Sequence, residues 1–290
     1  MQYHVNGDLV PEDEATVSVR DRGFMYGDAA FETLRVYGGD PFEWDAHRER
    51  LAHTAGTLGF ADAVPDDLRE RVAETLAAND LTEAYCKVSV SRGVQPGTLD
   101  PQPEVDPTVV VITKPLPRGG RDGERVWDGP ATVQTVRTRR VPGEAVPADI
   151  KSHNYLNGIL GRLELRRSAG DGGPADECLL RDIDGNVAEG ATSNVFFVTE
   201  NGLRTPSADL DLLPGVTRDV VLDLARDEGF PVETGAYSLD ALRNADEAFL
   251  TNSTWEIRPV ETVDGIDVGA GPMTKLLQRL YDERVETLHY

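Results

Sequence analysis

A run rich in proline and glycine at residues 114–123 is the feature that most limits how this chain can fold. Proline lacks a backbone donor and glycine loses the most conformational entropy on folding, so such a run seldom lies inside a helix or a buried strand. It is typical of the connection between two domains, and 290 residues are enough for two. We predict a smaller N-terminal domain over residues 1–117, a linker over 118–130 and a larger C-terminal domain over 131–290.

Each predicted domain contains both strand and helix patterns. These patterns indicate a mixed α/β (α+β) fold class. In the N-terminal domain we expect a hairpin at 1–10 with its turn at Asn6-Gly7, an extended piece at 15–19, a glycine-punctuated loop at 21–28, strands at 30–37, 41–44, 84–91 and 108–113, a helix at 45–58 capped by Asp45, and a helix at 66–79. In the C-terminal domain we expect strands at 131–138, 177–180 and 187–199, and a strand that runs into a polar turn at 248–255. We expect helices at 154–167, 216–228, 238–242 and 273–288.

Lysine is scarce in this chain, which has only Lys87, Lys114, Lys151 and Lys275. Lys151 lies at the start of an amphipathic run, and Tyr155 follows four residues later. An amine can form a Schiff base with a carbonyl, whereas a guanidinium stays protonated. A lone lysine at a helix start is more often a solvated surface residue. The hypothesis that Lys151 carries pyridoxal phosphate therefore needs support from the rest of the chain.

A pyridoxal phosphate site also needs an acid beside the pyridine nitrogen and a donor for the phenolate oxygen. Glu189 is the favoured acid, because it precedes an apolar strand and Gly190 lets a ring approach the backbone closely. The alternative is an ordinary surface glutamate, which is the safe assumption for any one acid in such a chain. Tyr155 would donate to the phenolate oxygen, unless it is a core tyrosine.

The phosphate needs several donors, and the start of the predicted helix at 216–228 can offer them. Val216 and Thr217 have backbone N–H groups there, Thr217 adds a hydroxyl, and the positive end of the helix dipole lies at the same place. A plain helix start would look the same. Ser253 and Thr254, in a polar turn after a strand, could add further hydroxyl and N–H donors.

An arginine in the stretch 47–51 would add a fixed positive charge for the phosphate. The residue could also be one arginine among many on a helix face. Spacing alone does not select Arg50 over Arg48.

Composition excludes several classes of partner. The chain has 29 basic and 51 acidic residues and a formal net charge of −22, so nucleic acid and anionic membranes are not expected partners. An acidic excess with arginine in place of lysine is typical of a halophilic protein from a high-salt cytoplasm. The two distant cysteines and five scattered histidines show no disulfide or metal-ligand spacing, and no signal region or membrane span is recognised. We expect a cytoplasmic protein without a metal site.

Six stretches together resemble the fold-type IV pyridoxal-phosphate enzymes, the class-IV aminotransferases. This family comprises branched-chain aminotransferases, D-amino-acid aminotransferases and aminodeoxychorismate lyases. The matching stretches are residues 26–35, 47–51, 150–157, 189–196, 213–218 and 251–254. The resemblance implies two α/β domains with the cofactor in the cleft between them, and a homodimer whose sites lie at the subunit interface. A long loop at 93–107 could then reach the partner's site.

The resemblance also implies roles for single residues. Lys151 is the catalytic Schiff-base lysine that moves the Cα proton, and Glu189 is the partner of the pyridine nitrogen. Arg50 is selected over Arg48 as a phosphate ligand. The expected cofactor-binding set is Arg50, Lys151, Tyr155, Glu189, Asn194, Val216, Thr217, Ser253 and Thr254.

The expected substrate residues are Phe31, Arg92 and Trp255. Phe31 stands where the D-amino-acid branch has a tyrosine, and Trp255 stands where branched-chain enzymes tend to have a small residue. Arg92 resembles an arginine that helps to trap the substrate carboxylate in the D-amino-acid branch, although no histidine follows it at 94–95. The stretch after Glu32 lacks the glycine usual in branched-chain enzymes, and residues 251–253 resemble the lyases.

We predict an aminotransferase that moves an amino group between an amino acid and a 2-oxo acid. The first alternative is an aminodeoxychorismate lyase, which uses the same lysine chemistry to release 4-aminobenzoate and pyruvate. A second alternative is a non-catalytic homologue that serves as a dimeric binding protein. Retention of Lys151, Glu189, Arg50 and Thr217 together argues against the second alternative.

Overall fold

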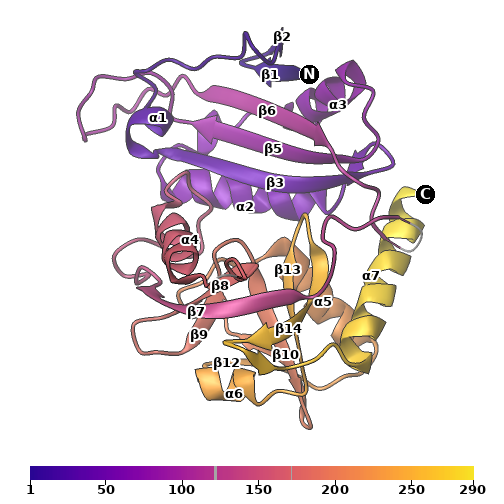
Figure 1. The fold of residues 1–290 in the computed structure, drawn as a ribbon. Helices are drawn as coiled ribbons and strands as arrows, with labels where there is room; N and C mark the ends of the chain where they lie inside the picture. Colours follow the sequence, from indigo (N-terminus) through magenta and orange to yellow (C-terminus); the bar gives the residue numbers. More distant parts are fainter. Residues whose placement is uncertain (121–122, 171) are drawn as a thin grey trace. The chain divides into compact units, whose positions relative to one another are not determined.

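The computed structural model describes residues 1–120, 123–170 and 172–290, and these residues form a mixed α/β fold (Figure 1). The described chain divides into two compact units. The first consists of Met1–Glu124, Ile150–Asn154 and Thr287–Tyr290, and the second of Arg125–Asp149 and Tyr155–Glu286. Lys151 therefore lies on a short segment of the first unit, although the chain on either side of this segment belongs to the second.

The domain ranges 1–117 and 131–290, with a linker at 118–130, remain our proposal for the boundaries. Residues 121 and 122 of the proposed linker lie outside the described residues.

The first unit is built on an antiparallel sheet with the strand order β2-β1-β6-β5-β3-β4. The strands are β1 (Gln2–Val5), β2 (Asp8–Pro11), β3 (Ala29–Tyr37), β4 (Asp40–Pro41), β5 (Ala84–Ser91) and β6 (Thr108–Pro115). The helices are α1 (Arg22–Tyr26), α2 (Trp44–Thr57) and α3 (Leu68–Ala78), with a 3-10 turn η1 (Ala61–Ala63). Helix α2 packs on β3, and α3 packs on β1 and β6 (Figure 1).

Alternation along the central strands decides which side chains form the core of the first unit. Leu34 of β3 and Val88 of β5 point toward the helices and pack with Leu51 of α2 and Val72 of α3. Successive strand residues face opposite sides of a sheet, so the residues between them lie on the other face. Phe31 and its cross-strand partner Ser89 lie on that second face.

The second unit is built on a mixed sheet with the order β12-β11-β10-β13-β14-β7-β8-β9, and β15 pairs with β14. Its strands are β7 (Ala131–Arg139), β8 (Glu177–Arg181), β9 (Val187–Gly190), β10 (Asn194–Thr199), β11 (Gly202–Pro206), β12 (Val232–Gly235), β13 (Glu247–Asn252), β14 (Glu256–Val263) and β15 (Ile266–Asp267). Its helices are α4 (Leu156–Ser168), α5 (Val216–Asp227), α6 (Leu239–Arg243) and most of α7 (Pro272–His289). Phe196 and Phe249 are register partners on β10 and β13, and their rings stack with centroids 4.9 Å apart.

Most of the predicted elements are confirmed. The hairpin at the N-terminus turns at Asn6-Gly7, and the strand at 84–91 has the predicted bounds. The helices predicted at 45–58, 66–79 and 216–228 are present within two residues at each end.

Several local predictions are wrong. Residues 15–19, all of them described, form no strand. The expected strand at 41–44 is reduced to the two residues of β4, and α2 begins at Trp44. Asp45 is not the cap of α2, because Glu43 occupies that position and Asp45 lies in the first turn. The extended run at 187–199 is broken into β9 and β10.

The glycine-punctuated loop expected at 21–28 contains the short helix α1. Asp21 caps it, because its carboxylate accepts hydrogen bonds from the backbone N–H groups of Gly23 and Phe24. Gly27 ends the helix in the left-handed conformation with φ of 72°, which glycine adopts without steric cost. A capping aspartate therefore makes a helical turn in a sequence whose glycines suggest a loop.

Helix α4 lies within two residues of the predicted range 154–167, and most of its leucines are exposed. Leu165 packs in the core, whereas Leu156, Leu160 and Leu163 are exposed. With Ile159, which is also exposed, these three leucines form an apolar stripe with helical spacing on the solvent side of the second unit.

Candidate active site

Lys151 is held through its backbone in the first unit. The N–H of Phe31 donates to the carbonyl of Lys151 at 2.9 Å, and the N–H of His153 donates to the carbonyl of Ala29 at 2.9 Å. The N–H of Lys151 donates to the hydroxyl of Thr54 on α2 at 3.0 Å. The segment 150–154 thus runs antiparallel beside the start of β3, and both a strand and a helix fix the position of Lys151.

The Lys151 side chain lies beside the Phe31 ring, and the amine of Lys87 lies beside the same ring. Its Nζ lies 4.8 Å from the centre of the Phe31 ring, and Lys87 Nζ lies 4.6 Å from the same centre. Burial lowers the pKa of Lys87, and the charge of Lys151 lowers it further. His153 packs edge-on against Phe31, with ring centroids 5.5 Å apart, and its Nε2 lies 3.1 Å from the Ser89 hydroxyl. Burial, aided by Lys87, lowers the pKa of His153 to about 4, so its ring is neutral near pH 7.

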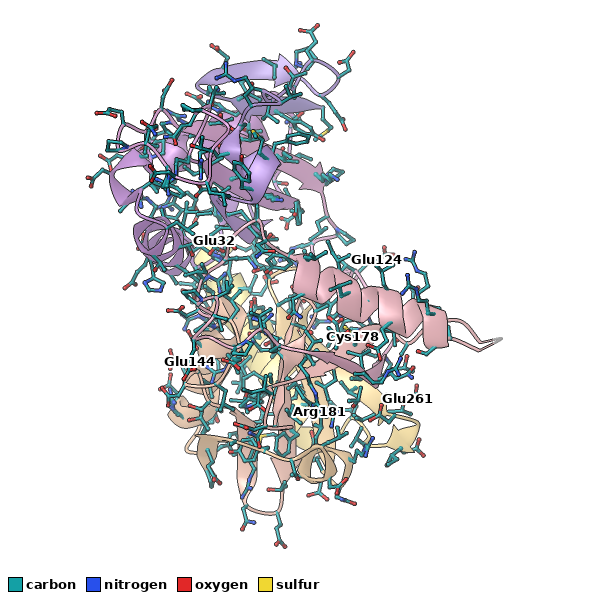
Figure 2. The ribbon with its side chains drawn as sticks, turned by 90° about the vertical axis from the view of Figure 1, so that its left-hand side faces the viewer. Glu32, Glu124, Glu144, Cys178, Arg181 and Glu261 are labelled. Carbon is teal, nitrogen blue, oxygen red and sulfur yellow. The ribbon has the colours of Figure 1, made fainter. Side chains whose placement is uncertain are left out.

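Arg50 forms a buried cluster with Glu32 and His47 in the same unit. Arg50 Nε donates to Glu32 Oε1 and Arg50 Nη2 donates to Glu32 Oε2, both at 2.7 Å. His47 Nδ1 lies 2.7 Å from Glu32 Oε2. Glu32 is 1 % exposed and lies beside α2 (Figure 2). Although burial favours the neutral acid, Arg50 and His47 lower the pKa of Glu32 to about 2.

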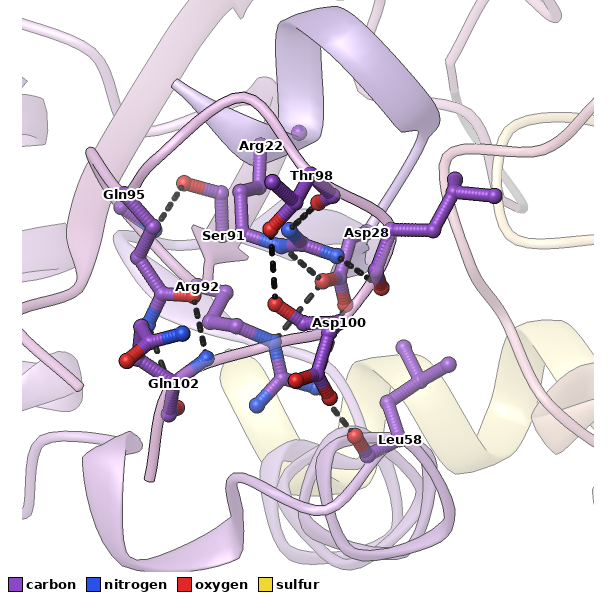
Figure 3. A network of polar contacts seen from close by, with 12 residues as sticks. Arg22, Asp28, Leu58, Ser91, Arg92, Gln95, Thr98, Asp100 and Gln102 are labelled. Carbon is purple, nitrogen blue, oxygen red and sulfur yellow. Dashed lines mark hydrogen bonds and ion pairs between the residues drawn. The ribbon is translucent and has the colours of Figure 1, made fainter. Parts of the chain in front are cut away.

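Arg92 lies in a different cluster, which supports the long loop at 93–107 (Figure 3). Its Nε donates to Asp28 Oδ2 at 2.7 Å, and its Nη2 donates to the carbonyl of Leu58. Its guanidinium also stacks over the Phe60 ring at 5.0 Å. Arg92 is 5 % exposed, so its side chain is a structural brace. A role as a ligand of a substrate carboxylate stays a prediction, and these contacts argue against it.

Arg22 shares the same carboxylate and reaches the loop. Its Nε donates to Asp28 Oδ2 at 2.7 Å, its Nη1 donates to the carbonyl of Thr98 at 2.7 Å, and its Nη2 donates to the carbonyl of Leu99 at 3.3 Å. The Gln95 side chain adds hydrogen bonds to the backbone of Gln102, one given and one received. The loop is thus ordered by its own side chains and by two arginines on one aspartate (Figure 3).

In the second unit, Glu189 is fixed by Arg140 and by the backbone. Arg140 Nε lies 3.0 Å from Glu189 Oε1, and the N–H of Leu213 donates to Glu189 Oε2 at 3.1 Å. Arg140 is itself held, because it donates to the carbonyl of Asp211 at 2.9 Å and to the side chain of Asn157 at 2.9 Å. The Glu189 carboxylate therefore has one defined orientation.

The start of α5 has the features of an anion site. Gly215 is the N-cap residue, and in the described chain no side chain caps the helix there, so Val216 and Thr217 begin it with uncapped backbone. Asn194 braces the approach, because its amide donates to the carbonyl of Leu213 at 3.0 Å. A Cβ on Gly215 would collide with Asn194 Oδ1, which is why glycine is required at this position.

The turn after β13 is organised by Asn252. Its Oδ1 accepts from the N–H of Thr254 at 3.1 Å, from the Thr254 hydroxyl at 3.0 Å and from the N–H of Trp255 at 2.7 Å. Its amide reaches the carbonyl of Thr192 at 3.3 Å. Ser253 lies in this turn between Asn252 and Thr254.

Trp255 and Tyr155 are both half-buried in the second unit. The carbonyl of Trp255 accepts a hydrogen bond from Trp127 Nε1 at 3.1 Å, and the Arg258 guanidinium lies 5.2 Å from its ring centre. Tyr155 occupies the position before α4.

The predicted site residues thus fall into two groups. Phe31, Arg50, Arg92 and Lys151 belong to the first unit, and Tyr155, Glu189, Asn194, Val216, Thr217, Ser253, Thr254 and Trp255 belong to the second.

Sequence reasoning missed residues that hold the predicted site residues in place, namely Glu32, His47, Arg140 and Asn252. It also missed Lys87, whose amine lies beside the Phe31 ring. Lys87 could have been found from the sequence, because lysine is rare in this chain and Lys87 is one of only four. Arg140 carries no such signal, because it lies among several arginines and its partner is far away in the sequence.

The described residues contain no group of three or more His, Cys, Asp or Glu side chains suited to a metal ion. None of the helices in the described ranges combines the length and apolar composition of a membrane span.

Comparison with curated proteins gives relatives that match this chain along nearly its whole length. It is 36% identical over 288 residues to a protein of Methanocaldococcus jannaschii whose provisional name is branched-chain-amino-acid aminotransferase, covering 98% of this chain and 96% of the relative. It is 33% identical to the aminodeoxychorismate lyase of Bacillus subtilis, covering 98% and 95%. It is 32% identical to the D-alanine aminotransferase of Listeria monocytogenes, covering 98% and 96%.

Solved structures give the same fold. The branched-chain aminotransferase of Thermoproteus uzoniensis with norvaline has a TM-score of 0.87 at 28% identity, covering 98% of this chain and 94% of the other. The branched-chain amino acid aminotransferase of Escherichia coli has a TM-score of 0.86 at 30% identity, covering 96% and 92%. The family model of amino-transferase class IV matches residues 29–263. The chain belongs to the class IV aminotransferase family.

Proposed function

We propose that this protein is a pyridoxal-phosphate-dependent aminotransferase that moves an amino group between an amino acid and a 2-oxo acid, with Lys151 as the residue that holds the cofactor. The setting of Lys151 is the observation that carries the proposal. Its backbone is hydrogen-bonded to β3 on one side and to α2 on the other, and its amine lies beside the Phe31 ring. An amine positioned in this way suits covalent catalysis better than a solvated surface charge does.

The chemistry of the donor set fits the cofactor. A phosphate dianion is matched by Arg50 and by the N–H groups and hydroxyl at the start of α5. A protonated pyridine nitrogen is matched by Glu189, whose orientation is fixed by Arg140. Asn194, and Ser253 and Thr254 in the turn that Asn252 organises, are proposed as further cofactor-binding residues. Tyr155 is proposed as the donor to the phenolate oxygen.

The bound cofactor supplies an electron-withdrawing ring that acidifies the Cα–H bond of an amino acid joined to it. Lys151 Nζ would remove that proton from Cα as a general base and, as a general acid, would deliver it to the cofactor carbon that carried the aldehyde, which is the proton shift that amino transfer needs. The Glu189 carboxylate would accept a hydrogen bond from the ring nitrogen and so would keep that nitrogen protonated. Arg50 and the start of α5 would hold the phosphate and so would limit the movement of the bound cofactor.

For the substrate, we propose Phe31 and Trp255 as pocket walls. Lys87 is an alternative to Arg92 as the cation for a substrate carboxylate, because Lys87 shares the Phe31 ring with Lys151 whereas Arg92 is engaged with Asp28. Lys87→Met should then raise KM for the amino acid more than it lowers kcat, and Arg92→Lys should chiefly lower stability. Steady-state kinetics and thermal unfolding of the two variants separate the alternatives.

A second candidate function is aminodeoxychorismate lyase activity. It is favoured by the 33% identity to the Bacillus subtilis lyase along nearly the whole chain. The same Lys151 chemistry would serve it, with elimination of pyruvate in place of amino transfer.

One experiment tests both functions. The cofactor-loaded protein is mixed in molar KCl with single amino acids of each hand and, separately, with aminodeoxychorismate, while the cofactor spectrum is followed. Conversion to the aminated cofactor with release of an oxo acid supports the aminotransferase and identifies the hand of its substrate. Release of 4-aminobenzoate and pyruvate, with amino acids inert, supports the lyase. A protein that stays colourless after incubation with the cofactor would contradict both.

We also propose that the protein is a homodimer. The exposed apolar stripe of Leu156, Ile159, Leu160 and Leu163 supports this, because an apolar stripe on a helix is seldom left in water. Leu160→Glu should shift the molecular mass in sedimentation from dimer toward monomer, and an unchanged dimer would remove α4 from the interface.

A further inference from the structure

The contacts of Glu32 carry a further inference, which rests on the proposed function. We propose that Glu32 is the positioning residue of the phosphate site: its carboxylate sets the rotation and reach of the Arg50 guanidinium, so that the Nη1 side of Arg50 meets the phosphate of the cofactor.

The carboxylate of Glu32 lies side-on to one edge of the guanidinium. Arg50 Nε and Nη2 each donate to a different Glu32 oxygen at 2.7 Å. Two parallel bonds between planar groups fix the plane of the guanidinium as well as its distance. These two bonds turn the edge of Arg50 that carries Nε and Nη2 toward Glu32, so we propose that the phosphate meets the guanidinium from the Nη1 side.

The bridge between strand and helix makes this orientation rigid. Glu32 is in the middle of β3, where it is paired with Val88 of β5 and is 1 % exposed, so it has little freedom to move. A long arginine side chain loses rotamer entropy when it is immobilised. Because Glu32 has already imposed that loss in the folded protein, the phosphate does not need to impose it on binding.

His47 is the third member of the cluster formed by Glu32 and Arg50. It precedes Arg50 by one helical turn on α2, and both side chains meet the same Glu32 carboxylate. Burial lowers the pKa of His47, so it is neutral near pH 7 and its Nδ1–H donates to Glu32 Oε2. The three side chains together carry no net charge, which lets them be buried without an unpaired ion.

Positioning and simple charge attraction make opposite predictions. Glu32 is an anion close to a proposed phosphate site, so Coulomb attraction alone would improve if Glu32 became neutral. If Glu32 acts by aiming Arg50, the neutral variant should bind the phosphate more weakly, even though the site has become more positive.

The test compares two ligands that differ only in the phosphate. Dissociation constants for pyridoxal 5'-phosphate and for pyridoxal are measured by absorbance on the full-length protein freed of cofactor. The variants are Glu32→Gln, Arg50→Ala and the control Glu247→Gln, which changes another buried glutamate, one that binds the start of α7. We expect Glu32→Gln to lower the preference for the phosphorylated ligand about tenfold, the size of one lost charge-assisted hydrogen bond, with pyridoxal affinity unchanged.

The outcomes distinguish this inference from the proposed function. If the unaltered protein does not prefer the phosphorylated ligand, the proposed function fails. If Arg50→Ala lowers the preference but Glu32→Gln leaves it unchanged or raises it, only the positioning role is overturned. Should Glu32→Gln fail to fold, Glu32→Asp keeps the charge but is one methylene too short for both bonds. If Glu32→Asp prefers pyridoxal 5'-phosphate over pyridoxal as strongly as the unaltered protein does, the positioning role of Glu32 is likewise overturned.

Discussion

Two buried arginine–carboxylate clusters lie in the first unit and differ in what their arginines bind. In one, Asp28 is shared by Arg22 and Arg92, which also donate to the backbone carbonyls of Leu58, Thr98 and Leu99. In the other, Glu32 binds one arginine and a neutral histidine, and the hydrogen bonds that define the cluster are all between side chains. Arg22 and Arg92 hold the chain through these backbone carbonyls, whereas we propose that Arg50, which Glu32 orients, serves the phosphate of the cofactor.

The two kinds of arginine, one that holds the chain and one that serves a ligand, cannot be told apart in the sequence. Arg92 was expected at the substrate and Arg50 at the phosphate. Buried arginine is commonly a sign of binding or catalysis, but the partners of the guanidinium decide between the two roles. The contrast can be tested in four ways.

The largest expected effect is on stability, from Asp28→Asn. It removes the one carboxylate shared by two buried guanidiniums, and breaking such a group costs about 3–5 kcal/mol. Denaturant unfolding measures the loss. The preference for pyridoxal 5'-phosphate over pyridoxal should stay as it is, once the variant is folded. A loss of that preference in folded Asp28→Asn would erase the contrast between the two clusters.

The next effect is the response of the Glu32 cluster to acid. The pKa of Glu32 is lowered from 4.5 to about 2, so its contribution is present above pH 4.5 and is lost as the pH falls through 2. The size is roughly 3 kcal/mol at 1.36 kcal/mol per pKa unit. The difference in unfolding free energy between the protein and Glu32→Gln should therefore shrink between pH 4.5 and pH 2. A constant difference across this range would contradict the assignment.

A smaller effect is expected from Gln95→Ala, which removes the hydrogen bonds that close the loop at 93–107. The loss in stability should be about 1 kcal/mol. Hydrogen exchange should rise within the loop and not in β3 or α2. Equal acceleration in α2 would mean that the loop cluster and the Glu32 cluster are coupled.

The smallest effect concerns salt. Screening by KCl weakens repulsion among exposed carboxylates, so the unfolding temperature should rise over the molar range in a chain of net charge −22. Buried pairs are screened much less. The stability difference between the protein and Asp28→Asn should therefore be the same at low and high KCl. If the unfolding temperature of the unaltered protein stays constant or falls as KCl is added, the proposal that the protein is halophilic is wrong.

The sequence predicts those parts of the fold that depend on local pattern. The strand at 84–91 is recognised because its apolar residues alternate, and the hairpin at the N-terminus because Asn6-Gly7 suits its tight turn. Helix α1 is missed because one capping carboxylate outweighs two glycines. The sequence predicts α4 as a helix but not the exposure of its leucines, because periodicity reveals an apolar face and does not say what covers it.

The candidate site is predictable as a set of residue types but not as a geometry. Glu189 is identified from its motif, whereas its brace Arg140 comes from a distant strand end and has no local signal. Glu32 lies inside a matched stretch, yet its role depends on the packing of α2 on β3. Contacts between distant segments follow from tertiary packing, which a single sequence does not display.

The division of the chain has a consequence for engineering. The polypeptide leaves the first unit after Glu124, returns for Ile150–Asn154, leaves again, and comes back at Thr287. A gene fragment that stops at Glu124 would lack the stretch that runs beside β3 and also the tail, where His289 packs against Tyr37. Neither unit can therefore be cut out as one continuous piece. A fusion or a circular permutant should place its new ends in the loop at 93–107 or in the hairpin at Asn6-Gly7. Both sites lie within one continuous segment of the first unit, so a cut there leaves the crossings between the units intact.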